Sequence, residues 1–167
     1  MNPRRDLLLA FLTLVVLGVV AGVLWAQLAD PVVATRTAEG VGSGEGELGK
    51  QVTADGWFTV IGLVGCALVA VGLMLRRGAD ALVTLIALLA GSLVAAWICV
   101  QVGALVGPAP AAETLARAAV GKTAEDQLSV HTWVAYLAWP FGAVVGSLVV
   151  LLGSRGSDRP RPAPVVQ

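Results

Sequence analysis

The chain has 167 residues, of which 57% are hydrophobic and 13% are charged, and its formal net charge is zero. Its mean hydropathy is +0.83. Soluble domains carry about 25% charged residues, so this composition excludes a water-soluble globular fold, which could not cover its own apolar surface.

Four stretches are apolar and long enough to cross the membrane, since about 30 Å of hydrocarbon takes about 20 helical residues. They are residues 7–28, 57–75, 81–106 and 130–152, and none contains a charged side chain. The alternation that marks barrel strands is missing, and helices satisfy their own backbone groups in lipid. We predict an all-α, four-helix transmembrane domain over residues 1–153, followed by a disordered tail at 154–167.

The first stretch has two interpretations. Arg4 and Arg5 precede it, as they would in a signal peptide. However, the apolar run exceeds the 7–15 residues typical of such a segment, and Ala26 and Ala29 form no clean cleavage site. We favour an uncleaved anchor, with a signal peptide as the alternative.

Basic residues are unevenly divided between the two sides of the predicted membrane. Seven flank the spans on the side of the termini: Arg4, Arg5, Arg76, Arg77, Arg155, Arg159 and Arg161. Four lie on the other side: Arg36, Lys50, Arg117 and Lys122. The positive-inside rule therefore places both termini in the cytoplasm. Four tryptophans near the outer ends of the spans suit the membrane interface: Trp25, Trp57, Trp97 and Trp133.

The two outer segments differ in composition. Residues 29–56 are rich in glycine and acidic residues, so we expect a mobile loop unless a partner orders it. In residues 107–129, Pro108 and Pro110 end the third span, and an alanine-rich stretch follows. We predict a short helix from Ala111 to Val120 on the outer membrane surface, with Gly121 as its C-cap.

Matches to cofactor-binding motifs in this sequence are contradicted by the residues around them. Residues 44–49 match GxGxxG, but they lie in an acidic outer loop without the strand and helix that a nucleotide site needs. Residues 121–123 resemble only the end of a P-loop. Cys66 and Cys99 have neither CxxC spacing nor a nearby histidine. We expect no cofactor, no metal, and neither nucleotide nor nucleic acid as a partner.

Small residues recur at helical spacing within the spans. The glycines concerned are Gly18, Gly22, Gly62, Gly65, Gly72, Gly91, Gly142 and Gly146. Such faces let helix backbones approach closely in lipid. Packing within the bundle is the favoured interpretation, and a surface for a partner helix is the alternative.

Two features predict the shape of individual helices. Pro140, after Trp139, predicts a kink near Tyr136. The three glycines of residues 57–75 predict that this span is the most enclosed, with Val64 and Leu68 shielded from lipid.

Polar residues near the outer ends of the spans form the candidate site. They are Gln27, Asp55, Gln101 and His131. We favour helix capping, in which Asp55 caps the second span and Ser129 caps the fourth. The alternative is a small outward-facing pocket where Asp55 and His131 pair. In that pocket Gln27 and Gln101 would supply hydrogen bonds.

Three local sequence features of this chain resemble those of a known group of membrane proteins. They are the DGWF sequence at residues 55–58, the Arg-Arg-Gly turn at 76–78, and Trp139-Pro140. On these, the chain resembles the uncharacterised small four-helix membrane proteins of high-GC Gram-positive (actinobacterial) bacteria, over about residues 7–153. The resemblance implies a bacterial plasma membrane and carries over no functional residue.

Three classes of function fit the sequence. The leading hypothesis is a non-catalytic accessory or assembly subunit that associates with another membrane protein or with itself. A transporter or channel component for a neutral or small solute is the alternative, although the spans lack the charged groups that coupled transport needs. A membrane enzyme would have to use Asp55, His131 or the cysteines.

Overall fold

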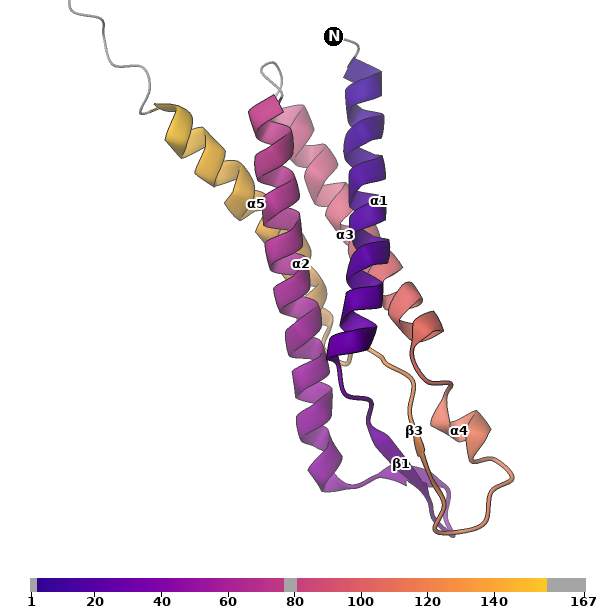
Figure 1. Ribbon diagram of the computed structural model, residues 1–167. Coiled ribbons are helices and arrows are strands. Elements are labelled where there is room, and N and C mark those ends of the chain that lie inside the picture. The colour runs from indigo at the N-terminus through magenta and orange to yellow at the C-terminus, as the bar shows by residue number, and fades with distance from the viewer. Residues whose placement is uncertain (1–2, 77–80, 156–167) are drawn as a thin grey trace, which may run out of the picture.

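The computed structural model describes residues 3–76 and 81–155 (Figure 1). Four long helices lie side by side: α1 (Pro3–Leu28), α2 (Leu48–Arg76), α3 (Ala81–Val106) and α5 (Trp133–Arg155). Each is long and apolar enough to cross a membrane, which confirms the four predicted spans. The predicted tail at 154–167 begins later, because α5 continues to Arg155; the rest of the tail lies outside the described residues.

The first close helix pair joins α1 to α3, which run parallel to each other. A Cβ atom added at Gly18 would lie 2.7 Å from the carbonyl oxygen of Ala95, and one at Gly22 would lie 2.7 Å from that of Cys99. Real Cβ atoms do not approach so closely. Glycine is therefore what allows these two backbones to touch, as at small-residue faces in membrane helices.

The second close pair joins α2 to α5 in the same way. A Cβ at Gly142 would overlap the backbone of Leu63, and one at Gly146 would overlap that of Ala67. Two of the predicted small-residue faces are thus occupied inside the bundle. Gly72 differs, because nothing lies within 4 Å of a Cβ placed there.

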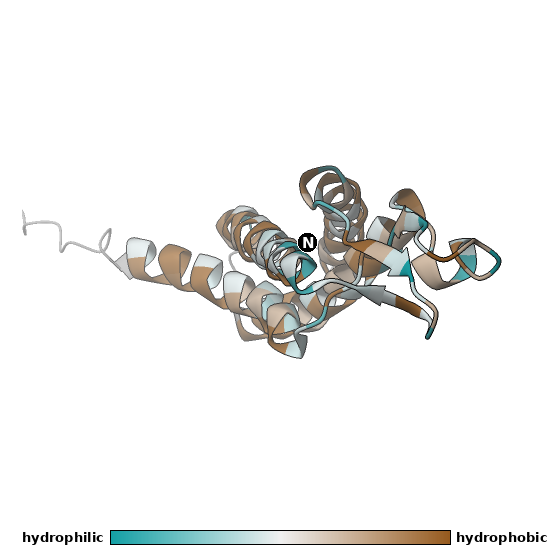
Figure 2. Ribbon diagram, turned by 90° about the horizontal axis from the view of Figure 1, so that it is seen from below, coloured by the Kyte–Doolittle hydropathy of each residue, from teal (hydrophilic) through white to brown (hydrophobic). Residues whose placement is uncertain are grey.

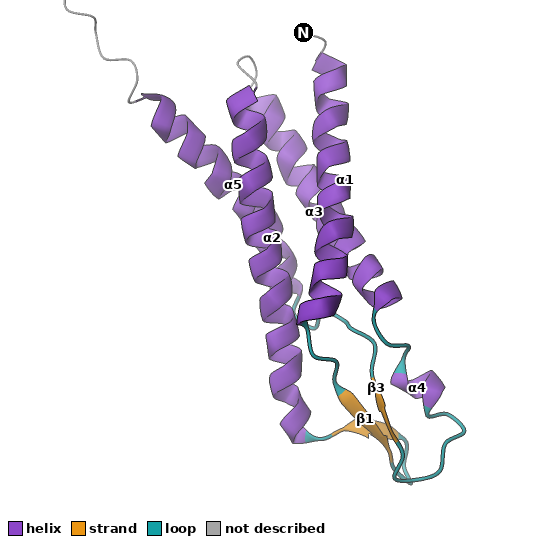
Figure 3. Cartoon of the chain, in the orientation of Figure 1, coloured by secondary structure: helices purple, strands orange, loops and turns teal. Residues whose placement is uncertain are grey.

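A small sheet lies beyond the ends of α1 and α3 and beside the first turns of α2, at the end where α2 and α5 begin, which we call the sheet end (Figure 3). It contains β1 (Val33–Arg36), β2 (Val41–Ser43) and β3 (Thr123–Glu125), in the order β2-β1-β3 with antiparallel pairing. Ala34 of the central strand pairs with Ser43 on one side and Ala124 on the other. Seen from the sheet end, hydrophobic residues run along the long helices, the strands are mixed, and hydrophilic residues lie mainly in the loops and at the near ends of helices (Figure 2).

This sheet corrects two expectations. The fold is mostly helical but not all-α, and residues 29–56 are not a featureless loop. The glycine-rich stretch supplies β2, the 3-10 turn η1 (Glu45–Glu47) and the first turns of α2. The order comes from partners distant in sequence: β1 pairs with β3, and the Val33 N–H donates to the Glu47 carboxylate at 2.9 Å. Composition alone does not reveal such pairing.

The helix expected from Ala111 to Val120 is much shorter. Only α4 (Ala111–Thr114) is helical, and turns follow it. Its Ala111 N–H donates to the Asp126 carboxylate at 2.8 Å, and Leu115 is buried together with Ala34 of the sheet. Ala111 and Leu115 thus anchor the turn on the sheet, in place of the longer helix expected on the membrane surface.

The expectation that the second span is the most enclosed is wrong. Val64 and Leu68 are 49% and 68% exposed, and the helix with the largest buried share is α3. Each of the two helices packs mainly on one neighbour and less on a second: α3 on α1 and then α5, and α2 on α5 and then α1. Helix α5 continues through Pro140 without a break.

Candidate functional site

Asp55 is the buried acidic residue at the sheet end of the bundle. It lies within α2, about two turns after that helix begins at Leu48, and it is 9% exposed. Its Oδ1 accepts the backbone N–H of His131 at 3.1 Å, and its Oδ2 accepts that of Thr132 at 2.9 Å. Helix α5 starts at the next residue, Trp133.

The capping prediction for Asp55 was therefore wrong about which helix is capped. The first N–H groups of a helix have no partner within it, and a carboxylate there is also favoured by the helix dipole. Asp55 meets that need for α5, not for its own helix, which begins earlier along the chain. It acts across 77 residues of sequence.

The His131 ring lies at the edge of this contact. Its Nδ1 is 3.9 Å from Asp55 Oδ1, an ion pair only when the imidazole is protonated. Its Nε2 is 3.4 Å from the Ser129 hydroxyl, where the donor depends on the tautomer. Ser129 thus contacts the ring and does not cap α5 as expected. Asp55 and His131 lie together, as the pocket hypothesis required.

The two glutamines do not join them. Gln27 and Gln101 are both exposed, on helix faces turned away from the bundle. Neither side chain has a hydrogen bond among the described residues. The candidate cluster of four thus reduces to one carboxylate and one imidazole.

The neighbouring residue links α2 to the first helix. Trp25 is fully buried, and its indole N–H donates to the backbone carbonyl of Ala54 at 2.8 Å. Consecutive residues of α2 therefore bind the end of α1 and the start of α5. Trp25 thus lies near the end of α1, but its ring faces the interior of the bundle. Its spacing of three and seven residues from Gly22 and Gly18 places it on the same buried face, a signal that the sequence did contain.

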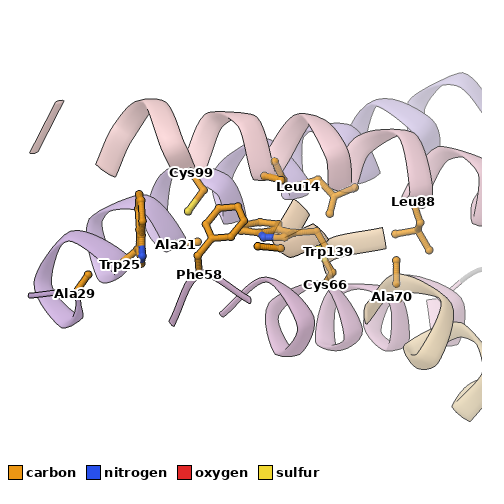
Figure 4. Close-up of a cluster of buried hydrophobic side chains, with 14 of the residues drawn as sticks. Leu14, Ala21, Trp25, Ala29, Phe58, Cys66, Ala70, Leu88, Cys99 and Trp139 are labelled. Carbon is orange, nitrogen blue, oxygen red and sulfur yellow. The ribbon is translucent and has the colours of Figure 1, made fainter. Parts of the chain in front are cut away.

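An aromatic cluster fills the bundle next to the contacts made by Ala54 and Asp55 (Figure 4). Phe58 lies at its centre, with ring centroids 5.6 Å from Trp25, 5.3 Å from Tyr136 and 5.4 Å from Trp139. Trp139 packs over Gly62, where any Cβ would overlap its ring. Its buried indole N–H has no hydrogen-bond partner among the described residues. No local pattern around Trp25 or Trp139 distinguishes the two indoles in this way.

The geometry of the Asp55 carboxylate suits the docking of α5 onto α2. Each of its oxygens accepts one backbone N–H group just before α5 and keeps a second lone pair. Within the described ranges, no group of three or more His, Cys, Asp or Glu residues could hold a metal ion.

The chain matches no protein-family model, no curated protein and no solved structure. Functional residues therefore cannot be transferred from a relative, and the proposals below depend on geometry and charge.

Proposed function

We propose that this chain is a multi-pass protein of the bacterial plasma membrane, with both termini in the cytoplasm, that serves as a non-catalytic accessory subunit of another membrane protein. The orientation follows from charge. The sheet end carries four of the eleven basic residues, and the opposite side carries the other seven. The sheet would then lie outside the cytoplasm.

An exposed face of α2 carries the proposal of a partner. Every fourth residue along this helix is exposed, in a stripe that we call the α2 face: Leu48, Val52, Gly56, Val60, Val64, Leu68 and Gly72. Residues four apart are neighbours on a helix surface, so these positions form one continuous strip, which turns around the helix by about 40° at each step. Nothing lies within 4 Å of a Cβ placed at Gly56 or Gly72, so these glycines are free of contacts within the bundle.

The α2 face extends beyond the other helices. Ala54 is level with Trp25 near the end of α1, and Asp55 is level with the start of α5. The residues of α2 before them therefore project about 10 Å farther. Leu48 and Val52, on this projection, are 55% and 73% exposed.

Lipid alone would not shield the apolar side chains of the projecting turns of α2 from water. Trp57 and Trp133 are exposed at the level where the projection begins, as expected of side chains at the membrane interface. Apolar side chains beyond that level would meet water. A transmembrane helix of a partner that also continues past the interface would cover this projecting part of the α2 face.

The packed interior supports a non-transport role. Trp25, Phe58 and Trp139 are each 0% exposed and fill the centre of the bundle. A solute path through a single copy would have to displace these side chains.

Site-specific photo-cross-linking in native membranes tests the proposal. A cross-linker at Val52 or Val64 should capture one and the same membrane protein, identified by mass spectrometry. A cross-linker at Val20, an equally apolar and exposed position on α1, is the matched control and should not capture it. Recovery of a lone monomer in mild detergent, with no protein adduct at either α2 position, would contradict the proposal.

A further inference from the structure

A groove lies between α1 and α3 at the end opposite the sheet. It has a volume of about 590 Å³, within the range of small-molecule sites. Its lining is entirely apolar: Leu7, Leu8, Phe11, Ala87, Ala90, Gly91 and Val94. It is separate from the α2 face and from the contact between Asp55 and α5.

The groove arises from how α1 and α3 pack. Their backbones touch at Gly18 and Gly22, nearer the sheet end. Towards their N-termini the Leu14 side chain lies between them, against Gly91. Toward their N-termini α1 and α3 diverge (Figure 1). The groove lies between them there and is open to the outside of the bundle.

The lining determines which part of a ligand the groove can take. A polar solute would find no hydrogen-bond partner there, and an apolar hollow does not hold ordered water. Ala87, Ala90 and Gly91 are small, so the space is left by short side chains on α3. Within a bilayer, a hydrocarbon chain is the ligand that fits.

Charge at the same end indicates the head group of that ligand. Because α1 and α3 are parallel, both present their N-termini there, and helix N-termini favour anions. In the sequence, Arg4 and Arg5 precede Leu7, and Arg76 ends α2. In the sequence, residues 4–6 and 76–80 together hold four arginines and two aspartates. The balance at this end remains positive.

We propose that the groove binds one anionic phospholipid, with an acyl chain between α1 and α3 and its phosphate at their N-termini. The proposal depends on the four spans lying in a bilayer and not on the existence of a partner protein. This lipid would stay bound, unlike the lipids around the rest of the protein, which exchange freely.

Native mass spectrometry of the full chain tests this after reconstitution in vesicles of equal parts phosphatidylglycerol and phosphatidylcholine. One phosphatidylglycerol per chain should remain bound. Ala90→Phe should fill the groove and reduce retention about tenfold or more. Ala90 is exposed, so the larger ring need not disturb the core. Val149→Phe, at an exposed position on α5, is the matched control and should retain the lipid.

A double variant, Arg4→Gln with Arg5→Gln, separates the head group from the chain. It should lose the preference for phosphatidylglycerol while still retaining a phospholipid. Thermal unfolding in detergent identifies variants that fail to fold. The proposal is overturned if the wild type retains no lipid, if Ala90→Phe folds and retains as much as Val149→Phe, or if Ala90→Phe instead releases a co-purifying protein helix.

Discussion

The carboxylate of Asp55 accepts the backbone N–H of Thr132 at 2.9 Å, so a side chain inside α2 closes the beginning of α5. The preceding residue, Ala54, accepts the indole N–H of Trp25 from α1. Two adjacent residues of one helix thereby set the depth of two others. The position where α5 enters the bundle is fixed by a charged acceptor and not only by apolar packing, which has little directional preference.

Replacing Asp55 should destabilise the bundle, and more so when both acceptor oxygens are lost than when only the charge is lost. Asp55→Ala leaves two N–H groups at the start of α5 without an acceptor, at an expected loss of about 2–3 kcal/mol. Asp55→Asn keeps one acceptor oxygen but loses the charge, so about 1–2 kcal/mol is expected. Unfolding in mixed micelles measures both losses.

The matched control for Asp55 is Glu39→Ala, since Glu39 is an exposed acidic residue at the same end of the molecule. It should change the free energy of unfolding by no more than about 0.5 kcal/mol. Equal effects of Asp55→Ala and Glu39→Ala would show that the contact with α5 contributes nothing to stability.

Two buried tryptophans should respond differently to the same substitution. Trp25→Phe removes a hydrogen bond to Ala54, whereas Trp139→Phe removes an N–H that has no partner among the described residues. Both lose similar ring area. We therefore expect Trp25→Phe to be more destabilising by about 1 kcal/mol. The two variants are each other's control in thermal unfolding, and a larger loss for Trp139→Phe would contradict the assignment of its indole as unpartnered.

The long helices were predictable because the local sequence of each is enough to identify it. An uncharged run of about 20 residues has one stable form in lipid, whatever its neighbours are. The ends were less accurate: α2 starts at Leu48, not Trp57, because polar residues such as Lys50, Gln51 and Asp55 interrupt the apolar run before Trp57 but are still helical. Hydropathy measures the lipid-embedded part of a helix and not its full length.

The sheet and the candidate site depended on contacts between distant residues. Strand β1 pairs with β3, and Asp55 binds Thr132, across separations that no local pattern encodes. Asp55 and His131 could be grouped because both lie near the ends of spans that share one side of the membrane. Gln27 and Gln101 satisfied the same depth criterion, but depth does not say which face of a helix a residue occupies.

Glycines at the α2–α5 contact should tolerate no added methyl group. Gly146→Ala would place its Cβ on the backbone of Ala67, and relieving that overlap should separate the two helices. A loss of about 1–3 kcal/mol is expected from overpacking. Gly72→Ala is the control, because nothing lies within 4 Å of its new Cβ. It should be neutral or slightly stabilising in the same unfolding assay; equal losses would indicate that α2 and α5 are not in close contact at Gly146.

Glu47 should hold the sheet against the start of α2. Its Oε2 accepts the Val33 N–H at 2.9 Å and lies 3.0 Å from Lys50 Nζ, so one carboxylate joins the region of β1 to the helix. Glu47→Ala should speed amide hydrogen exchange at Val33 and in the short strands that depend on it, because their few hydrogen bonds open locally. Glu45→Ala, at an exposed acidic neighbour, should leave exchange unchanged. Exchange throughout the middle of α2 should be the same in both variants, since the long helices fold independently of this link. If Glu47→Ala leaves Val33 protected, the sheet is held by strand pairing alone and the carboxylate is dispensable.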